Sequence, residues 1–134
     1  MMDTLEAYWQ EGLSCFLKEA FLEAHEAWER GWRSAREPER ALWKGWAQLA
    51  AGCLHLQRGN PKGAYTLFTR SRARLAQAPS SYRGLDMKAL LAALEGLLAN
   101  LGDPDLPLAH LLSVCSQGAT LGPRSAGAVY SEPA

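Results

Sequence analysis

A chain of 134 residues, 48% hydrophobic and 21% charged, suits one domain with a modest core and is too apolar for a disordered segment. The formal net charge is zero, which excludes a domain that binds nucleic acid through overall basicity. No apolar run approaches the ~20 residues of a membrane span, and the N-terminus lacks a signal-peptide pattern. Three widely spaced cysteines fit a reducing compartment, so we expect a cytoplasmic protein that does not enter a membrane.

Up to about residue 101, apolar side chains recur at helical spacing and Val and Ile are almost absent, which predicts an all-α fold. Asp3, with Glu6 three residues later, has the pattern of an N-cap pair. The apolar spacing then continues, so periodicity alone predicts one long first helix to residue 35. Glu37-Pro38-Glu39 is a turn signal, because the residue before a proline is disfavoured in a helix.

Three further helices are separated by turn residues. Gly59 suits the end of a helix, and Asn60 and Pro61 suit the start of the next one. Asp86 is a candidate N-cap for another helix. The predicted helices cover residues 39–58, 61–77 and 87–101.

The last third of the chain changes composition. Residues 105–112 are rich in leucine and are predicted to add a short docked helix. From residue 113 onward Ser, Gly, Ala and Pro dominate, which predicts a flexible C-terminal tail over 113–134. The expected fold is one compact all-α bundle of about five helices, built from antiparallel helix pairs within residues 3–112.

Two segments, FLKEAFLEAHEAWERGW and GWAQLAAGCLHLQRGNPKGAYTLF, carry a set of ordered motifs. These are an H-E-x-x-E-x-x-W helix, a small-residue helix that ends in His55, and a G-N-x-x-G-A start to the next helix. In this order and spacing they resemble the DUF309 family, small helical proteins of unknown function, over roughly residues 5–100. The resemblance implies a turn near Lys18-Glu19 that divides the first helix, and it implies no reaction or ligand.

Polar side chains in these motifs form a candidate site. His25 and Glu29 are neighbours one helical turn apart, on one shoulder of the apolar face, whereas Glu26 points further outward. A second polar stripe follows one face of the 39–58 helix. If the two faces meet, one cluster forms, flanked by Trp28 and Trp32 and composed of His25, Glu26, Glu29, Lys44, Gln48 and His55.

This cluster has two interpretations. In the first it is a buried polar network in which Lys44 neutralises a carboxylate, because buried polar groups need partners. In the second, His25, Glu29 and His55 are ligands of a divalent metal such as zinc, manganese or iron. The second histidine of the zinc-protease H-E-x-x-H pair is missing, and Lys44 competes for the carboxylates. We therefore expect no metal and no other cofactor.

The tryptophans are expected to lie mainly in the core. Trp28 is at the centre of the buried arc of its helix, so we expect it to be fully buried. Trp43 lies off the apolar seam that contains Trp46, so we expect it to be half exposed.

Charge is unevenly distributed: residues 3–39 carry nine acids and four bases, whereas residues 40–85 carry eight bases and no acid. We expect the two regions to complement each other within the fold. The expected function is a binding module for a protein partner or a second copy of the chain. One alternative is a metal-dependent, hydrolase-like enzyme that uses His25, Glu29 and His55. Another is phosphate or RNA binding, disfavoured by the neutral charge and the lack of interleaved surface aromatics. Its candidate residues are Arg58, Lys62, Arg70 and Arg74.

Overall fold

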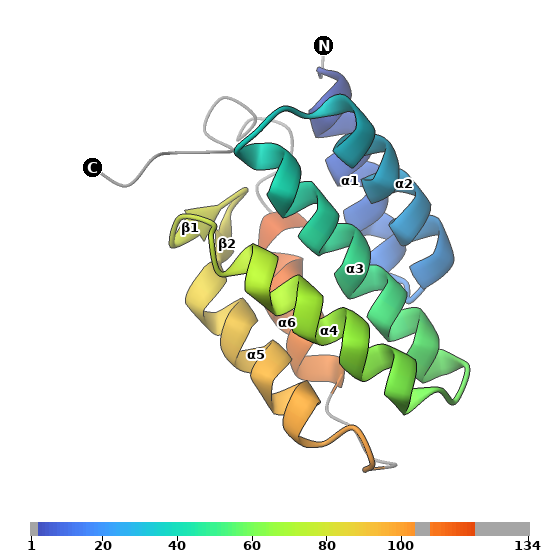
Figure 1. The fold of residues 1–134 in the computed structure, drawn as a ribbon. Helices are drawn as coiled ribbons and strands as arrows, with labels where there is room; N and C mark the ends of the chain where they lie inside the picture. Colours follow the sequence, from blue (N-terminus) through green and yellow to red (C-terminus); the bar gives the residue numbers. More distant parts are fainter. Residues whose placement is uncertain (1–2, 104–107, 120–134) are drawn as a thin grey trace.

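The computed structural model describes residues 3–103 and 108–119 (Figure 1). The predicted all-α class is confirmed: within these residues the chain forms six helices and one very short hairpin. The elements are α1 (Thr4–Leu17), α2 (Phe21–Ser34), α3 (Glu39–Gln57), α4 (Pro61–Leu75), β1 (Ser81–Tyr82), β2 (Leu85–Asp86), α5 (Met87–Ala99) and α6 (Leu108–Ala119).

The helices pack largely against their neighbours in the chain. α3 lies between α2 and α4, and α2 packs on α1 (Figure 1). α5 lies against α4, and α6 packs on both α5 and α1. Because α6 returns to α1, the beginning and end of the described chain are joined in one bundle.

The turn between α1 and α2 divides the long helix that periodicity predicts, as the family resemblance implies. Glu19 adopts a positive φ of 60°, and Ala20 N–H donates to the Cys15 carbonyl at 2.9 Å. Glu19 N–H donates to the Phe16 carbonyl at 2.9 Å, which completes a Schellman motif. The same motif ends α3, where Gly59 supplies the positive φ of 69°. The turn after α1 was not predicted from periodicity, because Glu19 and not a glycine holds its positive-φ position.

We predict that Glu19→Gly stabilises the protein. An L-residue in the left-handed region costs roughly 1–2 kcal/mol, and part of that gain is offset by the greater unfolded-state entropy of glycine. The expected increase in the free energy of unfolding is about 0.5–1 kcal/mol, measured by urea denaturation. Glu19→Ala is the matched control: it removes the charge but keeps the Cβ, so an equal gain from this variant would contradict the backbone explanation.

The core is built around four tryptophans that contact one another, each with an exposed fraction of 1% or less: Trp9, Trp28, Trp43 and Trp46. Trp9 stacks on Trp28 with ring centroids 5.4 Å apart. The expected burial of Trp28 is confirmed, but the half-exposed position expected for Trp43 is wrong. Gly31 of α2 leaves room for the Trp43 ring, because a Cβ at Gly31 would overlap it. Trp43 is therefore enclosed between two helices and not at the edge of one.

The predicted boundary at residue 112 also needs correction. α6 continues to Ala119, and Leu111, Val114 and Cys115 have exposed fractions of 0%, 5% and 0%. These residues are spaced by three and four positions, so they lie on one face of the helix despite the polar residues between them. The rest of the predicted tail, 120–134, lies outside the described residues.

We predict that a chain ending at residue 112 is less stable than one ending at residue 119. The shorter chain removes Val114 and Cys115 and exposes the side of the core that they cover. Burial of a side chain of this size contributes about 1.5–3 kcal/mol, so the combined loss should be about 3 kcal/mol. Thermal melts of the two truncated chains measure it, and coincident melting temperatures would show that α6 contributes little.

Candidate functional site

Three of the six predicted cluster residues meet where α2 packs on α3. His25 Nδ1 lies 3.0 Å from the Ala47 carbonyl, so this nitrogen is a hydrogen-bond donor. His25 Nε2 then faces Glu29 Oε1 at 3.5 Å, and Lys44 Nζ lies 3.3 Å from the same oxygen. The side chains are 30%, 18% and 28% exposed in the order His25, Glu29, Lys44. The group is therefore a half-buried, paired polar cluster open to solvent on one side.

Trp32 flanks this cluster as predicted. The Lys44 ammonium lies 4.4 Å from the ring centroid, and the Arg40 guanidinium lies 4.5 Å from it. Arg40 Nε also donates to the Trp32 carbonyl at 3.1 Å. Two cations of the same chain thus contact the half-buried indole. These contacts stabilise the packing of the start of α3 against the end of α2.

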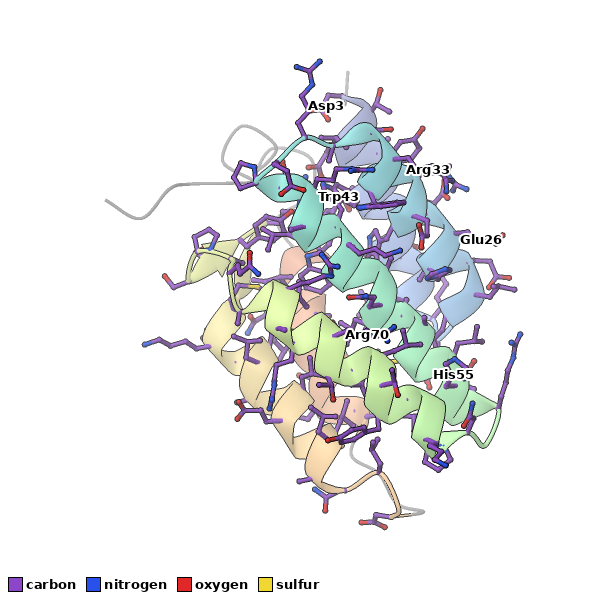
Figure 2. All side chains as sticks on the ribbon, in the orientation of Figure 1. Asp3, Glu26, Arg33, Trp43, His55 and Arg70 are labelled. Atoms are coloured by element: carbon purple, nitrogen blue, oxygen red, sulfur yellow. The ribbon has the colours of Figure 1, made fainter. Side chains whose placement is uncertain are left out.

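The other three predicted residues lie apart. Glu26 is exposed and projects from the outer side of α2 (Figure 2). His55 is eight residues beyond Ala47, about 12 Å along α3, and its Nδ1 lies 3.0 Å from Asn60 Nδ2. Gln48 is buried on α3, and its Oε1 has no hydrogen-bond partner within the described part of the chain. The six residues therefore do not form the single cluster that we predicted from sequence.

A metal site requires that its ligands lie close together, and the candidate ligands do not. Within residues 3–103 and 108–119, no three or more His, Cys, Asp and Glu side chains gather in a way that could hold a metal ion. The set His25, Glu29 and His55 is divided because His55 hydrogen-bonds the loop after α3. The hollow beside His25, about 440 Å³, is lined by side chains of α2 alone, among them Glu26 and Arg33. It is a surface depression along one helix, not a cleft between two.

Buried thiols do not supply a nucleophile either. Burial raises the pKa of Cys115 to about 12 and raises the pKa of Cys53 well above its ordinary value. Both side chains therefore remain thiols at neutral pH.

A second polar group, which sequence reasoning missed, lies at the start of α3. Arg83 occupies the two-residue turn of the β1–β2 hairpin, where it has a φ of 51° and Gly84 has a φ of 79°. Two positive φ values in a two-residue hairpin turn define a type I′ turn. The turn directs the Arg83 side chain inward, and the residue is only 2% exposed.

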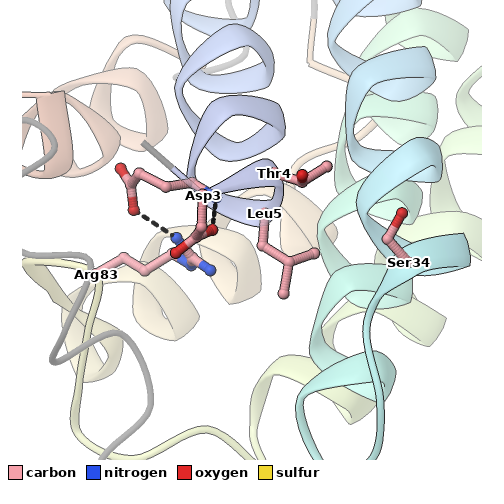
Figure 3. Close-up of a pocket in the computed structure, with 6 residues that line it drawn as sticks. Asp3, Thr4, Leu5, Ser34 and Arg83 are labelled. Atoms are coloured by element: carbon pink, nitrogen blue, oxygen red, sulfur yellow. Dashed lines mark hydrogen bonds and ion pairs between the residues drawn. The ribbon is translucent and has the colours of Figure 1, made fainter. Parts of the chain in front are cut away.

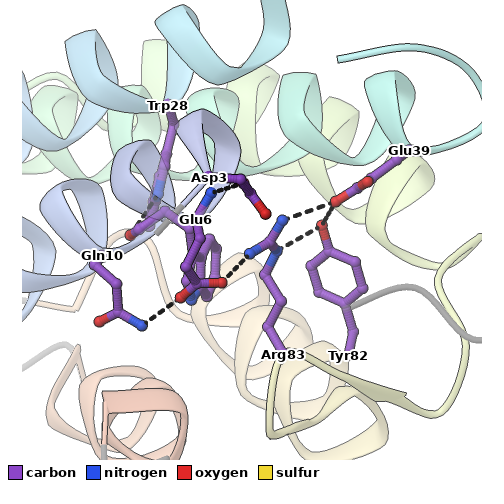
Figure 4. Close-up of polar contacts among 8 residues, drawn as sticks. Asp3, Glu6, Gln10, Trp28, Glu39, Tyr82 and Arg83 are labelled. Atoms are coloured by element: carbon purple, nitrogen blue, oxygen red, sulfur yellow. Dashed lines mark hydrogen bonds and ion pairs between the residues drawn. The ribbon is translucent and has the colours of Figure 1, made fainter. Parts of the chain in front are cut away.

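Arg83 connects three elements through charged hydrogen bonds (Figure 4). Its Nη1 donates to Glu6 of α1 at 3.0 Å, and its Nη2 donates to Glu39 of α3 at 2.9 Å. Its Nε donates to the Tyr82 hydroxyl at 3.1 Å, and that hydroxyl donates to Glu39 at 3.0 Å. Burial raises the pKa of Tyr82 far above its ordinary value, so the phenol stays protonated as a donor.

The Arg83 guanidinium also covers the tryptophan core. It lies 5.3 Å from the Trp9 ring and 5.1 Å from the Trp43 ring. Beside it is a hollow of about 320 Å³, lined in part by Asp3, Glu6 and Ser34 (Figure 3). All three guanidinium nitrogens already have partners, so Arg83 acts as a clamp between elements, not as a free anion-binding group.

One signal in the sequence points to this clamp. Glu6 shares the helical stripe of Trp9, Leu13 and Phe16, so a carboxylate falls among core positions. A buried carboxylate needs a cation, but the distance in sequence from Glu6 to Arg83 leaves the partner undetermined. In the structure Asp3 caps the α1 N-terminus at 2.8 Å from the Glu6 amide, while the Glu6 side chain binds Arg83 instead of completing a capping box.

We predict that Arg83→Met destabilises the fold by about 3–5 kcal/mol, because it leaves buried carboxylates without their cation. Adding Glu6→Gln should recover part of this loss, because it removes the uncompensated negative charge of the Glu6 side chain, which is 1% exposed. The measurement is the free energy of unfolding by denaturant for both variants. A double variant that is no more stable than Arg83→Met alone would contradict the interaction between Glu6 and Arg83.

The fold and both polar groups define a small all-helical domain without an assembled metal site among its described residues. The model of DUF309, a domain of unknown function, matches residues 9–67, so this part of the chain is similar to that family. The match covers the H-E-x-x-E-x-x-W helix and α3, whereas Glu6 and Arg83 fall outside it. No curated protein matches the chain. Among the described residues, no helix is both long and apolar enough to cross a membrane.

Proposed function

We propose that this domain is a binding module and that the outer face of α4 binds a polyanionic ligand. The observation that carries the proposal is a set of four bases without acidic partners in the part of the chain that the structure describes. These are the residues that the sequence offers for phosphate binding: Arg58, Lys62, Arg70 and Arg74. Lys62 and Arg70 are exposed on α4, Arg58 precedes this helix, and Arg74 lies at its edge toward α3.

The other four bases of residues 40–85 are engaged within the fold. Arg83 binds two buried carboxylates, Lys44 binds Glu29, and Arg72 lies 3.9 Å from Glu95. Arg40 covers the Trp32 ring. The expected pairing of acidic and basic regions thus accounts for some of the basic residues in 40–85. The basic residues that remain lie on and beside α4.

The packing of α4 leaves its unpaired basic side chains accessible to solvent. α4 contains no acid, and its inner face packs through Phe68 and Ser71 onto α3, where Ser71 Oγ donates to the Gly45 carbonyl at 2.8 Å. Lys62 and Arg70 are exposed on the outer side, and Arg70 stands on the front of α4 in Figure 2. Unpaired like charges on one surface create a positive potential that favours a ligand with several negative charges.

An enzymatic role has less support. The His25–Glu29–Lys44 cluster is internally paired, the three proposed metal ligands do not converge, and the buried cysteines are not activated. A binding surface needs none of these features.

The test measures the binding of fluorescein-labelled heparin by fluorescence anisotropy at several salt concentrations. Heparin is a polyanion that contains no nucleobases. We expect binding that weakens with salt, and a loss of at least about 10-fold in Lys62→Glu/Arg70→Glu, because released counterions drive such association. Arg36→Glu/Lys88→Glu is the control, since it changes the same charge at two exposed positions off α4. No binding by the wild-type protein, or an equal loss in the control, would refute the proposal.

A further inference from the structure

The basic face of α4 carries an exposed aromatic ring. Tyr65 is 56% exposed, and among the described residues the other large exposed apolar side chain is that of Leu22, at 42%. No hydrogen bond or ring contact holds the Tyr65 side chain among the described residues. An unpartnered ring on a helix surface is available to a ligand with a flat face.

The ring lies beside one of the exposed basic residues of α4. Lys62 is one helical turn before Tyr65, and Thr69 is one turn after it, so all three share a face of α4. Arg70 is also exposed, but it is five residues after Tyr65, about 140° around the helix, so it lies on another side of α4. The expectation of a surface without interleaved aromatics is therefore not met here, because an exposed ring lies one helical turn from the exposed Lys62.

From this arrangement, and resting on the proposed function, we infer that the polyanion is single-stranded nucleic acid, with Tyr65 as a stacking platform for a base. Single strands are bound by basic surfaces that follow the backbone together with aromatic rings on which unpaired bases stack. A duplex hides those base faces. Moreover, α4 is packed between α3 and α5, so it does not protrude as a helix that enters a major groove must.

The surroundings of Tyr65 favour this ligand over an acidic protein. Carboxylate-rich partners need only the basic side chains, and nothing in their chemistry calls for an exposed phenol one helical turn after Lys62. By contrast, Leu22 lies near the exposed acids Glu23 and Glu26 of α2, where a nucleic acid would be repelled. Leu22 therefore serves as a matched exposed apolar position outside the proposed surface.

The experiment measures anisotropy of a fluorescein-labelled 12-nucleotide oligothymidine and of the same strand annealed to its complement. We expect the single strand to bind at least about 5-fold more tightly than the duplex. Tyr65→Ala should weaken single-strand binding by roughly 5- to 100-fold, the range for loss of one base–aromatic stack. Tyr65→Phe should keep it within about 2-fold, since the ring face is retained. Leu22→Ala should leave it unchanged.

Heparin binding separates this inference from the proposed function. If heparin binds but the oligonucleotides bind equally well to wild type and Tyr65→Ala, the stacking inference fails and the polyanion surface stands. If poly-glutamate competes as strongly as oligothymidine at equal charge, an acidic partner replaces nucleic acid. If neither heparin nor the oligonucleotides bind, both proposals fail.

Discussion

The fold depends most on one buried cation. Arg83 is placed by a hairpin between two carboxylates and two indole rings, so the start of α1, the start of α3 and the C-terminal half meet at its guanidinium. A buried ion pair is weak evidence for net stability, because desolvation opposes attraction, but it discriminates strongly against arrangements that leave a charge alone. Only one placement of the hairpin satisfies both Glu6 and Glu39. The clamp thus specifies how the part of the chain outside the family match docks on the matched helices.

Local features of this fold follow from the sequence, and features that depend on distant contacts do not. The N-caps at Asp3, Asn60 and Asp86 were predicted because each accepts a hydrogen bond from an amide three residues away. The clamp at Arg83 was not predicted, since its partners lie 77 and 44 residues away in sequence. Trp43 was misplaced for the same reason, because the space for its ring is created on another helix.

The candidate site was predictable only within one helix pair. His25 and Glu29 were expected to be neighbours because helical spacing fixes them, and Lys44 joined them because α2 packs on α3 at that level. His55 shares the polar stripe of Lys44, but a stripe runs the whole length of a helix, so a shared face does not imply a shared site. The basic face of α4 was identified in the sequence as a set of residues. Its significance depends on which bases find acids in the fold, and sequence alone does not contain that information.

Glycines opposite aromatic rings have a consequence for how this fold can change over evolution. A Cβ at Gly12 would overlap Trp28, one at Gly31 would overlap Trp43, and one at Gly52 would overlap Phe68. Each interface between successive helices from α1 to α4 is therefore set by a ring against bare backbone, and such close packing tolerates almost no added volume. Inherited variation is directed to the outer faces of the helices, where side chains can be exchanged without repacking. Relatives with the same interior can thus acquire different surfaces, and a family defined by its core motifs need not share one ligand.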